Sequence, residues 1–317
     1  MRQTIRTKQG SAAAQDQMNL LKRIYKYRRT MYFLIPGFIC IFIFKYMPMY
    51  GITIAFKDYR MMDGIMASPW IGLEHFKRLF SGNDFYRVLW NTIRISFLKL
   101  LCGFPAPIIF ALLLNEVKNS KLKKIVQTFS YLPHFFSWVV LAGIMLALFS
   151  STGPVNLLLK NIGAGPVNFM GDKNAFIWFL VISSVWQGLG WGSIVYLAAI
   201  SGVNESLYEA ASIDGAGRFK KMISITLPSI LPTIVTVFVM NMGNVLDAGF
   251  DQVFNLYNPM VYDTADIIDT FVYRRMQAYD YSFGTAVGLF KSLVSLIMVV
   301  SANWVIGKIS GGEQGVW

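Results

Sequence analysis

The side chains best suited to bind a ligand are cationic, amide and indole groups that lie inside long apolar stretches of the chain. Ionisable groups are costly in a membrane, so those found there are candidates for a function. Amides and carboxylates bind hydroxyl groups, aromatic faces pack on flat apolar rings, and a lysine or arginine binds a carboxylate. We assign no catalytic residue and no metal ligand. The binding candidates are Arg94, Lys99, Trp186, Gln187, Trp191, Asn241, Asn244, Asp247 and Lys291.

Each candidate also has a purely structural interpretation. Arg94 is close enough to one membrane surface to extend its charge into the headgroups, whereas Lys99 and Lys291 lie deeper. A carboxylate such as Asp247 is a possible internal partner for these lysines. The tryptophans are also typical of membrane interfaces or helix packing, and the asparagines of hydrogen bonds between helices. Asn241 and Asn244 share a helical face, as do Asn244 and Asp247.

The composition indicates a membrane protein. Of the 317 residues, 55% are hydrophobic and 15% charged, and the mean hydropathy is +0.47; several apolar spans account for such values. The only cysteines, Cys40 and Cys102, lie in apolar runs and imply no disulfide, and two distant histidines argue against a histidine-rich centre. The net charge of +12 is consistent with nucleic acid, but the spans favour a membrane, with lipid as the surrounding partner.

The fold class predicted is an all-α integral membrane protein with six spans. We expect residues 1–30 to form a basic tail without a cleavable signal peptide, residues 31–309 the six-span domain, and residues 310–317 a short C-terminal tail. The spans are apolar windows of about 20 residues. They are Met31–Ile54, Val88–Leu114, Ile125–Phe149, Ala175–Ile200, Ser229–Leu246 and Ser282–Ile309.

The distribution of lysine and arginine predicts the orientation. The N-terminal tail holds eight of these residues and the loop 115–124 four lysines, while the loop 201–227 holds Arg218, Lys220 and Lys221. Because basic loops stay in the cytoplasm, these loops and both termini are predicted to be cytoplasmic.

The loop 201–227 carries a spaced motif. Glu209, Ala210 and Ala211 are followed after three residues by Gly215, and after nine more by Ile225-Thr226-Leu227-Pro228. Ser206 and Glu209 have the spacing of a capping box at the start of a short helix. Gly215 is suited to end that helix in a left-handed conformation, and Pro228 to begin the fifth span.

This motif resembles the signature loop of the inner-membrane permease subunits of binding-protein-dependent ABC importers. The resemblance implies that the loop forms a coupling helix, which docks into a cleft of a cytoplasmic ATPase. The residues that it assigns to this contact are Glu209, Ala210, Ala211, Asp214, Gly215, Leu227 and Pro228.

Further segments are similar to one branch of sugar permeases. They are Phe44–Gly51, Ala55–Tyr59, Trp70–Phe76 and Phe254–Pro259. That branch serves complex oligosaccharides, including uronic-acid-containing ones from alginate, pectin or xylan. The resemblance implies a bacterial inner-membrane location, a second permease subunit (a heterodimer is expected), two ATPase subunits and an external solute-binding protein. The chain has no Walker A motif, so we expect no cofactor of its own, with ATP bound by the ATPases.

Other functions make different demands on the sequence. A permease for neutral oligosaccharides is the nearest alternative. An ion-coupled secondary transporter needs an acidic or histidine relay within the spans, which instead carry lysine and arginine. A membrane-embedded enzyme needs clustered acidic, histidine or cysteine residues, and only the outer loop 247–281 has such a cluster. There Asp263, Asp266 and Asp269 are predicted to line one side of a helix that orients the binding protein.

Overall fold

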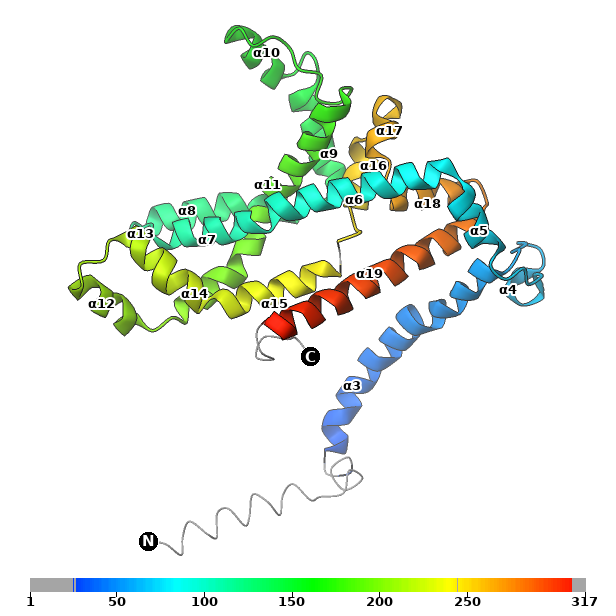
Figure 1. Ribbon diagram of the computed structural model, residues 1–317, viewed down its shortest axis with the longest axis horizontal. Coiled ribbons are helices and arrows are strands. Elements are labelled where there is room, and N and C mark those ends of the chain that lie inside the picture. Colours follow the sequence, from blue (N-terminus) through cyan, green and yellow to red (C-terminus); the bar gives the residue numbers. More distant parts are fainter. Residues whose placement is uncertain (1–24, 26, 244, 310–317) are drawn as a thin grey trace, which may run out of the picture.

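The computed structural model describes residues 25, 27–243 and 245–309, which are mainly helical and contain one isolated β-bridge, between Lys57 and Trp70. The long helices lie between α12 at one end of the molecule and α5 at the other (Figure 1). The α-helices are α3 (Arg28–Ile41), α4 (Gly64–Ala67), α5 (Glu74–Ser81), α6 (Asn83–Gly103), α7 (Pro105–Asn115), α8 (Ser120–Tyr131), α9 (Trp138–Phe149), α10 (Pro154–Asn161), α11 (Lys173–Ser201), α12 (Glu205–Ile213), α13 (Arg218–Lys221), α14 (Leu227–Ser229), α15 (Leu231–Met242), α16 (Phe250–Leu256), α17 (Tyr262–Ala265), α18 (Ile268–Gln277) and α19 (Tyr281–Ile309).

The predicted all-α membrane architecture is confirmed. Within the described residues, five helices are long and apolar enough to cross a membrane, and a bent pair of helices makes up to six. The five are Tyr32–Phe56, Asn83–Asn115, Trp138–Asn161, Lys173–Ser201 and Tyr281–Val305.

The third predicted span, residues 125–149, is not one helix, and its predicted start is wrong. Helix α8 ends at Tyr131, a 3₁₀ turn covers Leu132–Phe135, and α9 begins at Trp138. Pro133 in the turn has no N–H with which to continue the α-helix. The Ser137 side chain then accepts a hydrogen bond from the Val140 N–H at 3.4 Å and caps a new helix.

The fifth predicted span, residues 229–246, starts at a bend, and its helix α15 ends earlier, at Met242. The segment Arg218–Ser229 meets α15 at an angle of 59°. The break falls at Ile230, between Pro228 and Pro232, which each remove a backbone donor. Pro228 therefore precedes the bend instead of beginning a straight span.

The first span changes its helical form along its length. Helix α3 leads into a π-helical turn, Phe42–Tyr46, and then into a 3₁₀ segment, Met47–Phe56. The 3₁₀ segment packs on α19, whereas α3 extends away from the other helices (Figure 1). Only 6% of this span is buried.

Three groups of buried apolar side chains hold the remaining helices together. One joins α6, α9, α11 and α16 around Phe176 and Leu180. A second joins α5, α6, α18 and α19 around Phe85. The third joins α7 and α11 to Ile230, which lies between α14 and α15. Helix α11 thus contributes to the core both near α16 and near α7.

Candidate functional site

Two polar cavities lie where α6 gives way to α7. Gly103 and Phe104, at this junction, line both cavities. The first cavity, of about 280 Å³, is closed by α11 and α15. The second, of about 240 Å³, extends along α6 towards the segment after α15. Asn241, near the end of α15, lines both.

Two side-chain amides are among the polar groups that line the first cavity. Gln187 lines it from α11 and has no hydrogen bond to another described residue. Asn241 uses one amide N–H to donate to the Val237 carbonyl oxygen at 2.9 Å. The rest of both amides can bind a hydroxyl group.

One cation and one carboxylate line the second cavity. They are Lys99 on α6 and Asp247, which follows α15. The Lys99 ammonium donates to the Ala248 carbonyl oxygen at 2.6 Å and to Gln252 Oε1. Asp247 Oδ1 accepts a hydrogen bond from the Gly249 N–H at 3.1 Å. The predicted candidates Lys99, Gln187, Asn241 and Asp247 therefore come together at two adjoining cavities.

The other two cationic candidates lie elsewhere. The Lys291 ammonium on α19 binds the Asp269 carboxylate on α18, with distances of 2.7 Å to Oδ1 and 2.6 Å to Oδ2. Its charge is thus compensated within the protein. Arg94 lines neither cavity and has no ion pair with a residue that the structure describes. Asn244 lies outside the described residues.

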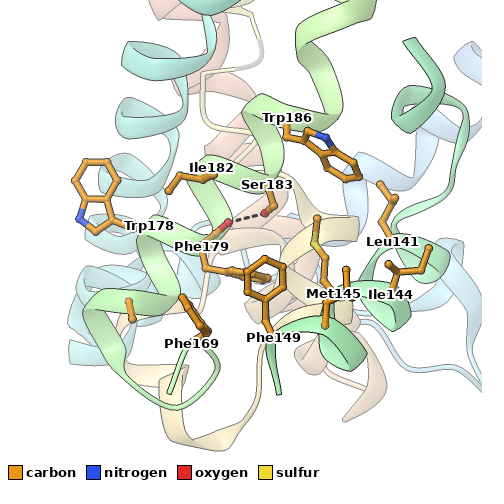
Figure 2. Close-up of a pocket in the computed structure, with 12 residues that line it drawn as sticks. Leu141, Ile144, Met145, Phe149, Phe169, Trp178, Phe179, Ile182, Ser183 and Trp186 are labelled. Atoms are coloured by element: carbon orange, nitrogen blue, oxygen red, sulfur yellow. Dashed lines mark hydrogen bonds between the residues drawn. The ribbon is translucent and has the colours of Figure 1, made fainter. Parts of the chain in front are cut away.

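The tryptophan candidates do not line the polar cavities. Trp186 lines a separate apolar pocket of about 460 Å³ between α9 and α11, where Figure 2 shows it with Leu141 and Met145. Trp191 stacks on His134, with ring centroids 4.6 Å apart and planes at 4°. Sugar-stacking roles for these two indoles therefore have no geometric support from the cavities.

The aromatic side chains at the cavities were missed by sequence reasoning. They are Phe104 and Tyr196. A signal for Tyr196 was present, because Gly188, Gly192 and Tyr196 are spaced by four residues and share a helix face. All three line the first cavity. A Cβ atom at Gly192 would lie only 3.0 Å from Pro107, so glycine lets α7 approach α11 closely.

The predicted coupling loop forms a short exposed helix, α12. The predicted capping box is wrong: Asn204 is the N-cap, and its side chain accepts a hydrogen bond from the Ser206 N–H at 3.0 Å. The helix begins one residue before Ser206, which places Ser206 and Glu209 inside it. Glu209 is exposed and has no hydrogen bond or ion pair with another described residue.

The C-terminal end of α12 has the left-handed glycine that the sequence predicted. Gly215 has a φ of +75°, and the next N–H, that of Ala216, donates to the Ala211 carbonyl oxygen at 2.8 Å. This is the left-handed helix end for which glycine is suited. Asp214 lies just before it, exposed to solvent.

Two side-chain contacts join α12 to the segment that leads into the fifth span. The Tyr208 hydroxyl lies 2.9 Å from Thr226 Oγ1, and Thr226 is 3% exposed. The Lys221 ammonium donates to Ser212 Oγ at 2.5 Å. These contacts attach α12 to residues 221–226, next to Leu227 and Pro228.

The three aspartates of the segment after α16 do not line one helix. Asp263 lies in α17, Asp266 follows it, and Asp269 lies in α18. Each has its own cation, so the predicted solvated helix face is wrong. Asp266 is buried and binds both terminal nitrogens of Arg274, at 2.8 and 2.5 Å. The hydrogen bond raises the pKa of Arg274, and Lys173 lowers the pKa of the exposed Asp263 carboxyl, mainly through a hydrogen bond.

Comparison with known proteins places the chain among transport proteins. Residues 103–311 match the family described as "Binding-protein-dependent transport system inner membrane component". The chain is 44% identical to Protein LplB of Bacillus subtilis over 286 residues, which cover 90% of this chain and 89% of LplB. It is 40% identical to the polygalacturonan/rhamnogalacturonan transport system permease protein YteP of the same organism, over 96% of this chain and 94% of YteP.

Two solved structures are similar to the chain over most of its length. One is a bacterial ABC transporter involved in the import of the acidic polysaccharide alginate, with 42% identity, a TM-score of 0.84, and coverage of 92% of this chain and 99% of the other. The second is a bacterial alginate ABC transporter in complex with alginate pentasaccharide-bound periplasmic protein. Its matching chain has 40% identity and a TM-score of 0.85, with coverage of 94% and 100%.

Proposed function

The chain belongs to the family of binding-protein-dependent transport system inner membrane components, and from this premise we propose that it is the permease subunit of an ABC importer for acidic oligosaccharides. The observation that carries the proposal is the pair of polar cavities lined by amides and by the Lys99 ammonium. Amides match sugar hydroxyls, and an ammonium matches a uronate carboxylate.

The substrates named for the relatives support this choice of sugar. YteP is named for polygalacturonan and rhamnogalacturonan transport, and the two similar structures are those of alginate transporters. A ligand that bears a carboxylate on its sugar rings would find one cation in the cavities. Lys291 is not available to bind a substrate carboxylate, because Asp269 compensates its charge.

The proposed partners are a second, different permease subunit, two cytoplasmic ATPase subunits and an external solute-binding protein. ATP binds to the ATPases. Helix α12 is the proposed contact with an ATPase, and exposed apolar side chains near it support this: Ile213 is 88% and Phe219 70% exposed. Large apolar side chains exposed on one surface are typical of a protein–protein contact.

The proposed mechanism is alternating access driven by the ATPases. Closure of the ATPases displaces α12, and the Tyr208–Thr226 contact passes the displacement to the bent fifth helix. Helix α15 carries Asn241, so its movement changes the walls of both cavities. This chain binds and releases the sugar and breaks no bond in it.

A permease for neutral oligosaccharides is the second candidate. Asp247 lines the same cavity as Lys99 and offsets its charge, and the Lys99 ammonium already has two acceptors within the protein. Under this alternative, the lysine stabilises the protein and the amides bind the sugar.

Uptake kinetics of two cation variants distinguish these candidates. In cells that carry the whole importer, we expect Lys99→Met to raise the KM for labelled trigalacturonate on the order of tenfold, or ~1.4 kcal/mol. The control, Arg94→Met, removes an equal charge from the same helix but outside the cavities, and should leave the KM within twofold. Membrane abundance of each variant is measured by immunoblot. An unchanged KM in Lys99→Met would favour the neutral-sugar candidate.

A further inference from the structure

The Lys99 ammonium is held by a turn that is distant in the sequence. Its acceptors are the Ala248 carbonyl oxygen, at 2.6 Å, and Gln252 Oε1. Both belong to the turn that begins α16, whereas Lys99 lies on α6. An ammonium has three N–H donors. Two are used in this way, so one remains for an oxygen in the cavity that Lys99 lines.

The direction of the Gln252 amide is fixed by a third helix. Gln252 is 1% exposed, and its Nε2 donates to the Leu180 carbonyl oxygen and to Ser183 Oγ, both at 2.8 Å. Ser183 itself donates to the Phe179 carbonyl oxygen at 2.6 Å (Figure 2), so its oxygen accepts from Gln252. Both amide hydrogens are therefore bound to α11. The amide oxygen must face Lys99.

Gly249 allows this close approach. Its φ of +84° lies in the left-handed region that favours glycine. A Cβ atom at this position would lie 2.8 Å from the Lys99 Nζ atom. Any other residue would push the ammonium away from the Ala248 carbonyl group. Residues 248–252 thus form the binding site of the Lys99 ammonium group.

We propose that Gln252 is a specificity-determining positioning residue, which presents the Lys99 ammonium to the carboxylate of an acidic sugar. This inference rests on the proposed function. A buried amide is suited to the role because it accepts from the ammonium without neutralising it. A glutamate of nearly the same shape would form an ion pair with Lys99 and place its second oxygen against the Leu180 carbonyl oxygen.

The main test is Gln252→Glu. It is assayed by uptake of trigalacturonate and of its methyl ester, in which all three carboxylates are esterified so that the rings are the same but carry no charge. The external binding protein is the same in all assays, so differences between variants originate in the permease. We expect the KM for trigalacturonate to rise about tenfold with little change in maximal rate, and the kinetics of the ester to stay within twofold. A merely structural role would lower the maximal rate for both sugars.

Two further measurements keep the test decisive. In a Lys99→Met background, Gln252→Glu should add no further rise in the KM for trigalacturonate, because the group it acts through is gone. Ser183→Ala, a milder change that removes one acceptor of the Gln252 amide, should raise that KM about threefold even if Gln252→Glu fails to assemble.

The outcomes separate this inference from the proposed function. If the wild type takes up trigalacturonate but Gln252→Glu and Ser183→Ala leave its KM within twofold, the positioning role is refuted. The same holds if both sugars lose maximal rate equally. If the wild type ignores trigalacturonate altogether, the proposed substrate class itself is wrong, and the inference fails with it.

Discussion

At the scale of single residues, the buried Asp266 carboxylate is held by donors of α18, the helix that follows it. Asp266 accepts hydrogen bonds from Thr270 Oγ1 at 2.7 Å and from Arg274. Its side chain is only 4% exposed, whereas that of Asp263 is 60% exposed. A buried carboxylate depends on its donors, because burial without them costs several kcal/mol. An exposed one is solvated by water.

Asp266→Asn should therefore destabilise the protein by about 3 kcal/mol, because it leaves Arg274 half-buried without its carboxylate. Asp263→Asn is the matched control in the same segment and should change stability far less. The measurement is the thermal unfolding midpoint of the purified protein in detergent. Equal midpoints for both variants would contradict the assigned difference in burial.

The sequence predicted the candidate residues at this scale only in part. Lys99, Gln187, Asn241 and Asp247 were identified by their chemistry within apolar stretches. Gln252 was not, because its role depends on a contact with Lys99, from which it is separated by 153 positions. Lys291 was wrongly grouped with the cavity residues for the same reason, because its partner Asp269 belongs to a different helix.

At the scale of helices, hydropathy predicted where spans occur but not where they break. A window of about 20 residues averages over local signals. Pro133 and Ser137 interrupt the third predicted span, and Pro228 and Pro232 flank the bend in the fifth. Each break has a chemical cause that is visible in the sequence. The capping box was predicted wrongly because Asn204, a strong N-cap residue, lies two positions before Ser206.

The coupling role of α12 predicts two variants that fold but transport poorly. Glu209 has no described partner, so Glu209→Ala should leave abundance unchanged while uptake falls severalfold. Gly215→Val adds about 1–2 kcal/mol of backbone strain at a φ of +75°. Gly215→Asn is the matched control, because asparagine tolerates this conformation and no atom lies within 4 Å of a new Cβ. Full transport by both Glu209→Ala and Gly215→Val would refute the assignment.

The orientation predicted from the basic residues can be tested by thiol labelling. In a variant without Cys40 and Cys102, the substitutions Lys121→Cys and Arg218→Cys should resist an impermeant thiol reagent added to intact cells. Glu74→Cys, in α5 at the end opposite α12 (Figure 1), should react. Labelling of the first two positions from outside would overturn the predicted topology.

At the scale of the whole molecule, apolar windows and short motifs predicted the fold class and the family. They did not predict how the helices pack against one another. The spacing from Glu209 to Pro228 predicted the family that the comparisons confirm. Which polar groups line a cavity depends on how α6, α7, α11 and α15 meet. That arrangement is set by contacts such as that of Gly192 with Pro107, which join residues far apart in the chain.

The most direct measurement of the proposed function uses the assembled importer, purified with its second permease and ATPases, in liposomes with its binding protein. Labelled trigalacturonate and its methyl ester are supplied outside, with ATP inside or omitted. The account predicts that trigalacturonate accumulates only with ATP, and much faster than the ester. ATP-dependent accumulation of the ester, with trigalacturonate ignored, would contradict it.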